Sequence, residues 1–325
     1  MKRLSAVFLI FALSSCSFLS SNNSSTPELE RNVLTGLVGS NGKVLAVKFD
    51  DTTYAHPQEG VESADVVIVT QVEAGLTRLM GIYSSQYPEV LGPIRSARIS
   101  DIDILAQFGK VGFLYSGSQS KLRPVLSASN LVHLSAERNP PSIYFNDPER
   151  TAPYAMMVKP NLLLPKADDV VNVSSIGWSH GKKSTFATPV ASATIRWPNA
   201  VYKAMWNKET KRFLLEHDNK PNVASSSIQL GSPMMVIQLV SIKPSEYGDK
   251  FGGVTPKTTV TGNGTGYLLR NGTVTKVQWS RPTAESPTSW TLEDGKEATF
   301  QRGQVWMFLT DQEPEFAYPP AKPSK

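Results

Sequence analysis

The sequence predicts an α+β protein in which an N-terminal mixed α/β domain is followed by a smaller antiparallel β-rich domain. The first half alternates short β-branched and apolar runs with stretches of helical periodicity. In the second half, Asn271-Gly272 and Asp294-Gly295 lie between strand-like runs, and such dipeptides are the strongest short-range signal for a β-hairpin. The chain of 325 residues is also longer than one typical domain. We therefore assign residues 33–198 to the first domain and residues 199–312 to the second.

The first strands of the N-terminal domain are expected to end in acidic turns. Residues 43–49 form a β-branched and apolar run that ends in Asp50-Asp51, so this strand would deliver two carboxylates to a loop. Residues 65–73 and 76–84 form two further runs of this kind. They are separated only by Ala74-Gly75, and so short a gap favours an antiparallel hairpin.

Two helices and one more strand complete the pattern of this domain. From Ser96 to about Gln107, apolar residues recur at the spacing of an α-helix, and Gly109 ends the pattern. Residues 111–115 are typical of a buried strand, and residues 121–127 are typical of a second helix.

The second domain is expected to be an antiparallel meander. Residues 201–216 have the pattern of a hairpin, and residues 233–242 that of a long apolar strand. Residues 313–325 are rich in proline, which predicts a mobile C-terminal tail.

The N-terminus has the pattern of a bacterial lipoprotein signal. The basic pair Lys2-Arg3 precedes a short apolar run, and Leu13-Ser14-Ser15 then leads directly to Cys16, the only cysteine of the chain. The apolar run is shorter than the ~20 residues that a membrane-crossing helix needs. We expect residues 1–15 to be removed as a signal peptide, the sulfur of Cys16 to carry a diacylglyceryl group, and residues 16–32 to form a flexible tether. The alternatives are an uncleaved N-terminal anchor and a buried cysteine without such a role.

Lipidation of Cys16 predicts a protein anchored at the extracytoplasmic face of the cell membrane. Loss of Lys2 and Arg3 with the signal peptide lowers the formal charge from +5 to +3, which is too small to indicate a nucleic-acid partner. The chain has no Walker motif and no dinucleotide-binding glycine fingerprint, so no cofactor is expected.

Polar side chains gather at the expected strand ends and turns of the first domain, and such loops are where binding residues concentrate. Arg95 and Arg98 flank the expected helix start, where free N–H groups and the helix dipole favour an anion. The candidate ligand-binding residues are Asp50, Glu73, Thr77, Arg78, Arg95, Ser96, Arg98, Ser116, Ser118, Asp147 and Arg150. The alternative is that the arginines only hold loops together, by pairing with Asp50, Asp65 and Glu73.

Patterns for catalysis and metal binding are weak. The histidines form neither an H-x-x-x-H nor an H-E-x-x-H pair, so the sequence predicts no metal site and assigns each of them a surface or structural position. They are His56, His133, His180 and His217. Around Ser116 and Ser118 the G-x-S-x-G turn of serine hydrolases is missing. Asp50 and Glu73 would serve acid–base chemistry if the fold brought them together.

Several blocks of the sequence occur in a characteristic order. They are Pro57-Gln58-x-Gly60, Val72-Glu73-Ala74-Gly75-x-Thr77-Arg78, Gly92-Pro93-Ile94-Arg95-Ser96-Ala97-Arg98, Ser116-Gly117-Ser118, Asp147-x-x-Arg150-x-Ala152-Pro153, Gly262-x-Gly264-x-Gly266, Asn271-Gly272 and Gly303-x-x-Trp306. With these blocks the chain resembles the YerB-like bacterial lipoproteins, a family defined by domain of unknown function 3048. One departure is Tyr154, where the family usually has a histidine. The resemblance implies a lipid-anchored, extracytoplasmic protein of two domains and implies no particular reaction.

The sequence therefore predicts a non-enzymatic lipoprotein. Its first domain would bind an anionic or polar component of the cell envelope, such as a wall polymer or a partner protein, through the cluster of arginines and acids. One alternative is an enzyme acting on an envelope glycan or a phosphate-bearing polymer, with Asp50 or Glu73 as acid or base and Arg95 stabilising charge. Another is a scaffold of a membrane complex, which would present a large apolar patch.

Overall fold

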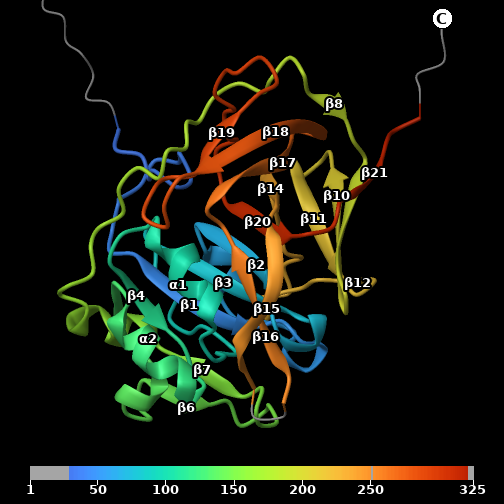
Figure 1. Ribbon diagram of the computed structural model, residues 1–325. Coiled ribbons are helices and arrows are strands. Elements are labelled where there is room, and N and C mark those ends of the chain that lie inside the picture. The colour runs from blue at the N-terminus through green and yellow to red at the C-terminus, as the bar shows by residue number, and fades with distance from the viewer. Residues whose placement is uncertain (1–28, 250–251, 321–325) are drawn as a thin grey trace, which may run out of the picture.

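The computed structural model describes residues 29–249 and 252–320 (Figure 1). In this part of the chain, eleven strands form one large sheet. Ten of them follow the order β19-β18-β17-β14-β20-β2-β3-β1-β4-β5, and β8 pairs with β18. The strands are β1 (Leu45–Asp50), β2 (Val66–Gln71), β3 (Thr77–Tyr83), β4 (Val111–Leu114), β5 (Leu131–His133), β8 (Thr188–Pro189), β14 (Met234–Leu239), β17 (Gly262–Arg270), β18 (Thr273–Arg281), β19 (Ser289–Thr291) and β20 (Val305–Thr310).

The N-terminal strands and helices follow the expected pattern. β2 and β3 pair antiparallel, and β1 lies between β3 and β4, antiparallel to the first and parallel to the second. The expected helices are α1 (Ile99–Ala106) and α2 (Arg123–Ala128). At the start of α1, the carboxylate of Asp101 accepts a hydrogen bond from the backbone N–H of Arg98 at 2.7 Å, which satisfies a free donor of the helix terminus.

A second sheet of six strands packs beside the large one. Its order is β12-β11-β10-β9-β21, with β13 paired to β11. The strands are β9 (Ser192–Trp197), β10 (Ala200–Asn207), β11 (Arg212–His217), β12 (Lys220–Pro221), β13 (Gly231–Ser232) and β21 (Glu315–Ala317). The hairpin expected over residues 201–216 is β10 with β11.

Two short hairpins complete the described fold. β15 (Ser241–Gly248) pairs with β16 (Val254–Thr259), and β6 (Tyr144–Asn146) pairs with β7 (Met156–Val158). β16 packs against α1, where the backbone N–H of Thr258 donates to the hydroxyl of Ser100 at 2.9 Å.

One strand joins the two halves of the chain. β20, close to the C-terminal end, lies between β14 and β2 and runs parallel to both, so that Val305 is opposite Met234 on one side and Val66 on the other. The β14–β20 pairing lies within the half for which the sequence pattern indicated antiparallel strands, and the β2–β20 pairing joins that half to the N-terminal one. The expected boundary at residue 198 falls between β9 and β10, which pair with each other in one sheet.

Both ends of the fold extend further than expected. Asn32, assigned to the tether, is buried, and its side-chain amide donates to the hydroxyl of Ser84 at 2.9 Å. Glu315–Ala317, assigned to the mobile tail, forms β21 and pairs with β9, which would otherwise be an open sheet edge. The signal peptide and Cys16 lie outside the described residues, as do residues 321–325.

Buried side chains form two apolar clusters on opposite faces of the large sheet. Along β1, Leu45 and Val47 belong to one cluster and Ala46 to the other, as the alternation of side chains in a strand requires. The first cluster includes Tyr202 of β10, and the second includes Leu105 of α1. The second sheet therefore covers one face and α1 the other. No helix in the described part of the chain combines the length and apolar character that crossing a membrane requires.

A buried ion pair lies in the α1-facing cluster. Lys48 of β1 and Asp101 of α1 are fully buried, and the Nζ of Lys48 lies 2.6 Å from Oδ1 of Asp101. Burial lowers the pKa of Lys48, and the charge of Asp101 opposes this shift.

We predict that Lys48→Met lowers the free energy of unfolding by about 3–5 kcal/mol, because it leaves the buried carboxylate of Asp101 without its counter-charge. Adding Asp101→Asn removes that charge while keeping an acceptor for Arg98, so the double variant should regain most of the loss. Urea denaturation followed by circular dichroism measures both. A single variant within 1 kcal/mol of the wild type would contradict the buried pair.

Candidate functional site

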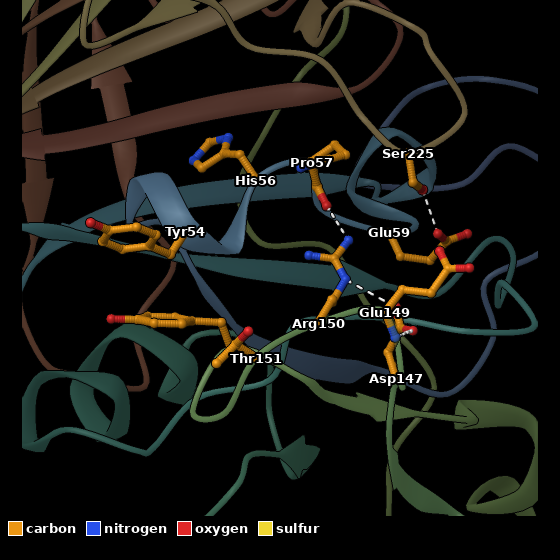
Figure 2. Close-up of a pocket in the computed structure, with 10 residues that line it drawn as sticks. Tyr54, His56, Pro57, Glu59, Asp147, Glu149, Arg150, Thr151 and Ser225 are labelled. Atoms are coloured by element: carbon orange, nitrogen blue, oxygen red, sulfur yellow. Dashed lines mark hydrogen bonds and ion pairs between the residues drawn. The ribbon is translucent and has the colours of Figure 1, made fainter.

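A cavity of about 770 Å³ lies beside the loop that follows β1 (Figure 2). It is lined by Tyr54, His56, Pro57, Glu59, Asp147, Glu149, Arg150, Thr151, Tyr154 and Ser225. A second cavity of about 270 Å³ shares Tyr54 and Tyr154 with the first. Its other lining residues are Asp51, Thr52, Thr53, Leu76, Thr77, Asn199, Ala200, His217 and Asp218. We call the two cavities together the tyrosine cleft.

Four segments of the chain form the tyrosine cleft. The first is the loop of residues 51–59 after β1, and the second is the loop of residues 147–154 between β6 and β7. The third comprises residues 199–225 around the second sheet, and the fourth is Leu76-Thr77 at the start of β3. The cleft therefore lies where the two halves of the chain meet, and it depends on how they pack together.

Two tyrosine rings face each other at the centre of the cleft. The ring centroids of Tyr54 and Tyr154 are 5.5 Å apart, with an angle of 33° between the planes. Tyr54 is 77% exposed although it is large and aromatic. The guanidinium of Arg95 lies 5.4 Å from the ring centroid of Tyr154, within the range of a cation–π contact. These rings offer aromatic faces to a ligand.

Arg150 ties the two loops of the cleft to each other. Its Nε donates to Asp147 at 3.1 Å, and its two terminal nitrogens donate to the backbone carbonyls of Ala55 and Pro57 at 3.1 and 2.5 Å. Figure 2 shows Arg150 between Pro57 and Asp147, and Ser225 bonded to Glu59 on the same side. Asp147 and Arg150 thus line the cavity, and the hydrogen-bonding capacity of Arg150 is largely used in holding its walls.

Asp50 is fully buried between two arginines. Its carboxylate lies 3.2 Å from Nη1 of Arg78 and 2.7 Å from Nε of Arg95. The backbone N–H and the hydroxyl of Thr52 both donate to Oδ1 of Asp50 at 2.9 Å. Burial lowers the pKa of Arg78, and the charge of Asp50 opposes this. Two of the candidate arginines are therefore paired inside the protein.

The third arginine is paired as well. Arg98 binds Glu73 through two parallel hydrogen bonds of 2.6 and 2.9 Å, and the hydroxyl of Thr255 in β16 also donates to Glu73. Burial raises the pKa of Glu73, but the bonds from Arg98 outweigh it and leave this pKa below its usual value. This group fastens the turn after β2 to the start of α1 and to β16.

The serines among the candidate residues lie outside the tyrosine cleft. The hydroxyls of Ser96 and Ser116 are 3.2 Å apart, and the backbone joins the same two segments because the N–H of Ser116 donates to the carbonyl of Arg95 at 3.0 Å. Ser118 is half-buried in the turn that follows. Thr77, in contrast, lines the second cavity.

The fold adds a cluster that the sequence did not indicate. Asp51 is buried, and the hydroxyl of Tyr202 donates to its two carboxylate oxygens at 2.9 and 3.0 Å, while the hydroxyl of Thr77 donates to Oδ2 at 2.5 Å. Nε2 of His56 lies 3.3 Å from Oδ1 of Asp51, and Nε2 of His217 lies 3.7 Å from Oδ2. His56 and His217 thus belong to one group with Asp51, whereas the sequence assigned each of them only a surface or structural position.

The two histidines of the cluster come from opposite halves of the chain. Their rings are stacked, with centroids 5.0 Å apart and 11° between the planes. Burial raises the pKa of Asp51, but the charge of His217 and the hydrogen bond from His56 outweigh it and lower this pKa to about 2. Burial lowers the pKa of His56, yet the contacts with Asp51 outweigh this effect and raise it. The carboxylate of Asp51 is therefore held ionised. The cluster of Asp51, His56 and His217 is defined by proximity in the fold and not by any spacing in the sequence.

Comparisons with known proteins agree with the resemblance that the sequence blocks indicate. Residues 34–172 match the family model described as "Protein of unknown function (DUF3048) N-terminal domain", and residues 193–307 match the corresponding C-terminal domain. A stretch of 98 residues is 33% identical to "Putative lipoprotein YerB" of Bacillus subtilis (strain 168) and spans 28% of each protein.

The fold is also that of a solved structure. The crystal structure of the YerB protein from Bacillus subtilis has a TM-score of 0.75 to this chain at 17% sequence identity, and the match covers 89% of this chain and 99% of that one. The two family models together cover most of the chain, in the order that the sequence blocks predict. This chain is a member of the DUF3048 family, whose N-terminal and C-terminal domains it contains.

Proposed function

We propose that this protein is anchored by a lipid at the extracytoplasmic face of the cell membrane and binds a polar cell-wall glycan in the tyrosine cleft. The anchor is supported by the signal pattern that ends at Cys16 and by the lipoprotein name of the Bacillus subtilis relative. A diacylglyceryl group supplies two acyl chains, which suffice for stable anchoring where a single chain is marginal.

The two tyrosine faces of the cleft carry the proposal for its ligand. An exposed aromatic ring such as Tyr54 gives an apolar face that can stack on a sugar ring, while its hydroxyl remains available to water or to a ligand. Around it, Glu59, Glu149 and Thr151 supply polar groups, and a cavity with aromatic walls and a few polar groups is typical of ligand sites.

The pairing of the arginines favours a polar ligand over an anionic one. Arg78 and Arg95 share the carboxylate of Asp50, and Arg98 is bound by Glu73, so all three guanidiniums are already held by internal carboxylates. Moving Arg98 to an external anion would leave the carboxylate of Glu73 without its counter-charge, which is costly, and moving Arg78 or Arg95 would break a close ion pair of Asp50. The acidic groups Glu59 and Glu149 in the cleft wall also repel anions.

The same contacts favour binding over catalysis by the carboxylates first considered. Asp50 is fully buried and Glu73 nearly so, and both are held by arginines. A general acid or base must come within hydrogen-bond reach of its substrate, and neither carboxylate lines the tyrosine cleft. A polar cleft also fits a binding protein better than a pure scaffold, for which an apolar patch would be expected.

We predict that Tyr54→Ala weakens binding to purified peptidoglycan about two- to thirteenfold, because one aromatic contact contributes about 0.5–1.5 kcal/mol. Sedimentation of the full-length protein with the polymer measures the bound fraction. Tyr318→Ala is the matched control, since Tyr318 is also an exposed tyrosine, near the C-terminus and outside the cleft lining. Equal binding by both variants and the wild type would refute the role of the cleft.

We predict that a radiolabelled fatty acid is incorporated into the wild-type protein and not into Cys16→Ser. The substitution removes the only thiol to which the acyl glycerol can be attached. Membrane fractionation of cells producing each form gives the second measurement, in which only the wild type should remain with the membrane after a high-salt wash. Label in the variant, or none in the wild type, would contradict the anchor.

A further inference from the structure

We propose that Asp51, His56 and His217 bind one divalent transition-metal cation of the zinc class, where the two cavities of the tyrosine cleft meet. His56 lines the larger cavity, and Asp51 and His217 line the smaller one. One ligand atom from each residue lies within 4.8 Å of the other two. This inference goes beyond the proposed glycan binding, since it concerns a group that the protein would hold by itself.

The separations of the ligand atoms fit a shared metal ion. Zinc lies about 2.0–2.2 Å from nitrogen and carboxylate ligands, so that two ligands in tetrahedral geometry are roughly 3.4 Å apart. His56 Nε2 lies 3.3 Å from Oδ1 of Asp51, and His217 Nε2 lies 3.7 Å from Oδ2 of the same carboxylate. Good N–H···O hydrogen bonds measure about 2.7–3.2 Å. The His217 contact is therefore too long for a direct hydrogen bond, and the His56 contact lies just beyond the usual range.

The environment of His217 is a second, independent argument for a bound cation. Its side chain is only 7% exposed, and its Nε2 has no hydrogen-bond partner among the described residues. Buried polar atoms are paired in most proteins, and an exception calls for an explanation such as an ion. Its Nε2 lies 3.7 Å from Oδ2 of Asp51 and 3.8 Å from Oδ2 of Asp218. This nitrogen therefore has carboxylate oxygens near it but bonds to none of them, an arrangement that a shared cation would explain.

The groups around Asp51 act as a supporting shell. The hydroxyls of Tyr202 and Thr77 donate to its carboxylate, and the side-chain amide of Gln58 lies 3.3 Å from Oδ1 of Asp51. Metal-binding carboxylates are commonly fixed by such outer hydrogen bonds, which orient the ligand and limit its rotation. The carboxylate is therefore pre-positioned before any cation arrives.

The donor set indicates the class of cation. Two imidazole nitrogens and one carboxylate oxygen suit zinc and neighbouring transition metals, whereas calcium and magnesium prefer oxygen ligands alone. Three protein ligands leave a fourth position open, and the adjoining cavities would allow an oxygen atom of a bound polar molecule to occupy it. The cation would also join the loop after β1 to β11, and so connect the two halves of the chain.

The test uses Zn²⁺ and Co²⁺ alone, with the full-length protein purified in detergent after treatment with a chelator. Isothermal titration calorimetry should give one Zn²⁺ per chain with a dissociation constant in the micromolar range or tighter. Co²⁺ should give visible absorption bands of a four- or five-coordinate site. His56→Ala and His217→Ala should each weaken Zn²⁺ binding at least about tenfold, whereas His133→Ala, outside the cluster, should match the wild type.

Two results would overturn the metal site. One is a wild-type protein that binds no stoichiometric Zn²⁺ and gives no Co²⁺ bands, a readout that requires no variant to fold. The other is unchanged Zn²⁺ affinity in the His56→Ala/His217→Ala double variant with a native circular dichroism spectrum. Because no glycan is present in either measurement, the metal site and the glycan-binding cleft can fail separately.

Discussion

The parallel pairing of β20 with β2 is the constraint on which the rest of the structure depends. It inserts a strand from near the C-terminus into the sheet of the N-terminal half, so that the two halves share one backbone hydrogen-bond network. Side-chain contacts reinforce this junction. Tyr202 of β10 packs against Trp306 and Phe308 of β20, and the indole N–H of Trp197 donates to the carbonyl of Leu309. With β10 fixed on β20, Tyr202 and His217 are carried to Asp51, and the tyrosine cleft forms.

The junction between the two halves contains buried charged groups, which are unfavourable unless they are paired. Buried charges are tolerated when each has a partner, and Lys48, Asp50 and Glu73 all meet this condition. These pairs fix the loops at the ends of β1, β2 and β3, and Arg150 does the same for the outer wall of the cleft. The polar groups that hold the cleft thus bond mainly to one another, which leaves the exposed Tyr54 and the half-buried Tyr154 as the groups most free to meet a ligand.

Local patterns in the sequence predicted the local parts of the fold. The β-branched and apolar run of β1, the gap at Ala74-Gly75 and the helical spacing of α1 each depend on neighbouring residues, and each element was confirmed. The pairing of β2 with β20 could not be predicted, because nothing near Val66 or Val305 specifies a partner so distant along the chain.

The same limit applies to the candidate site. The sequence identified Asp147, Arg150 and Thr77, which line the cleft. It gave the pairing of the arginines with acids only as an alternative, and the fold pairs them with Asp50 and Glu73. His56 and His217 match no metal-binding motif, because such motifs describe ligands close together in sequence, whereas this cluster exists only after the two halves have packed. Asp50-Asp51 marked the correct loop, and only the fold distinguishes the role of the second carboxylate from that of the first.

A double-mutant cycle between Asp51→Ala and Tyr202→Phe tests the junction most directly, since the two side chains come from different halves and meet at 2.9 Å. The free energies of unfolding of the wild type, the two single variants and the double variant give the coupling energy. The account predicts a favourable coupling of about 0.5–3 kcal/mol, the range found for residues in direct contact. Simple additivity within about 0.3 kcal/mol would mean that the two halves do not meet at this carboxylate, and would contradict the account.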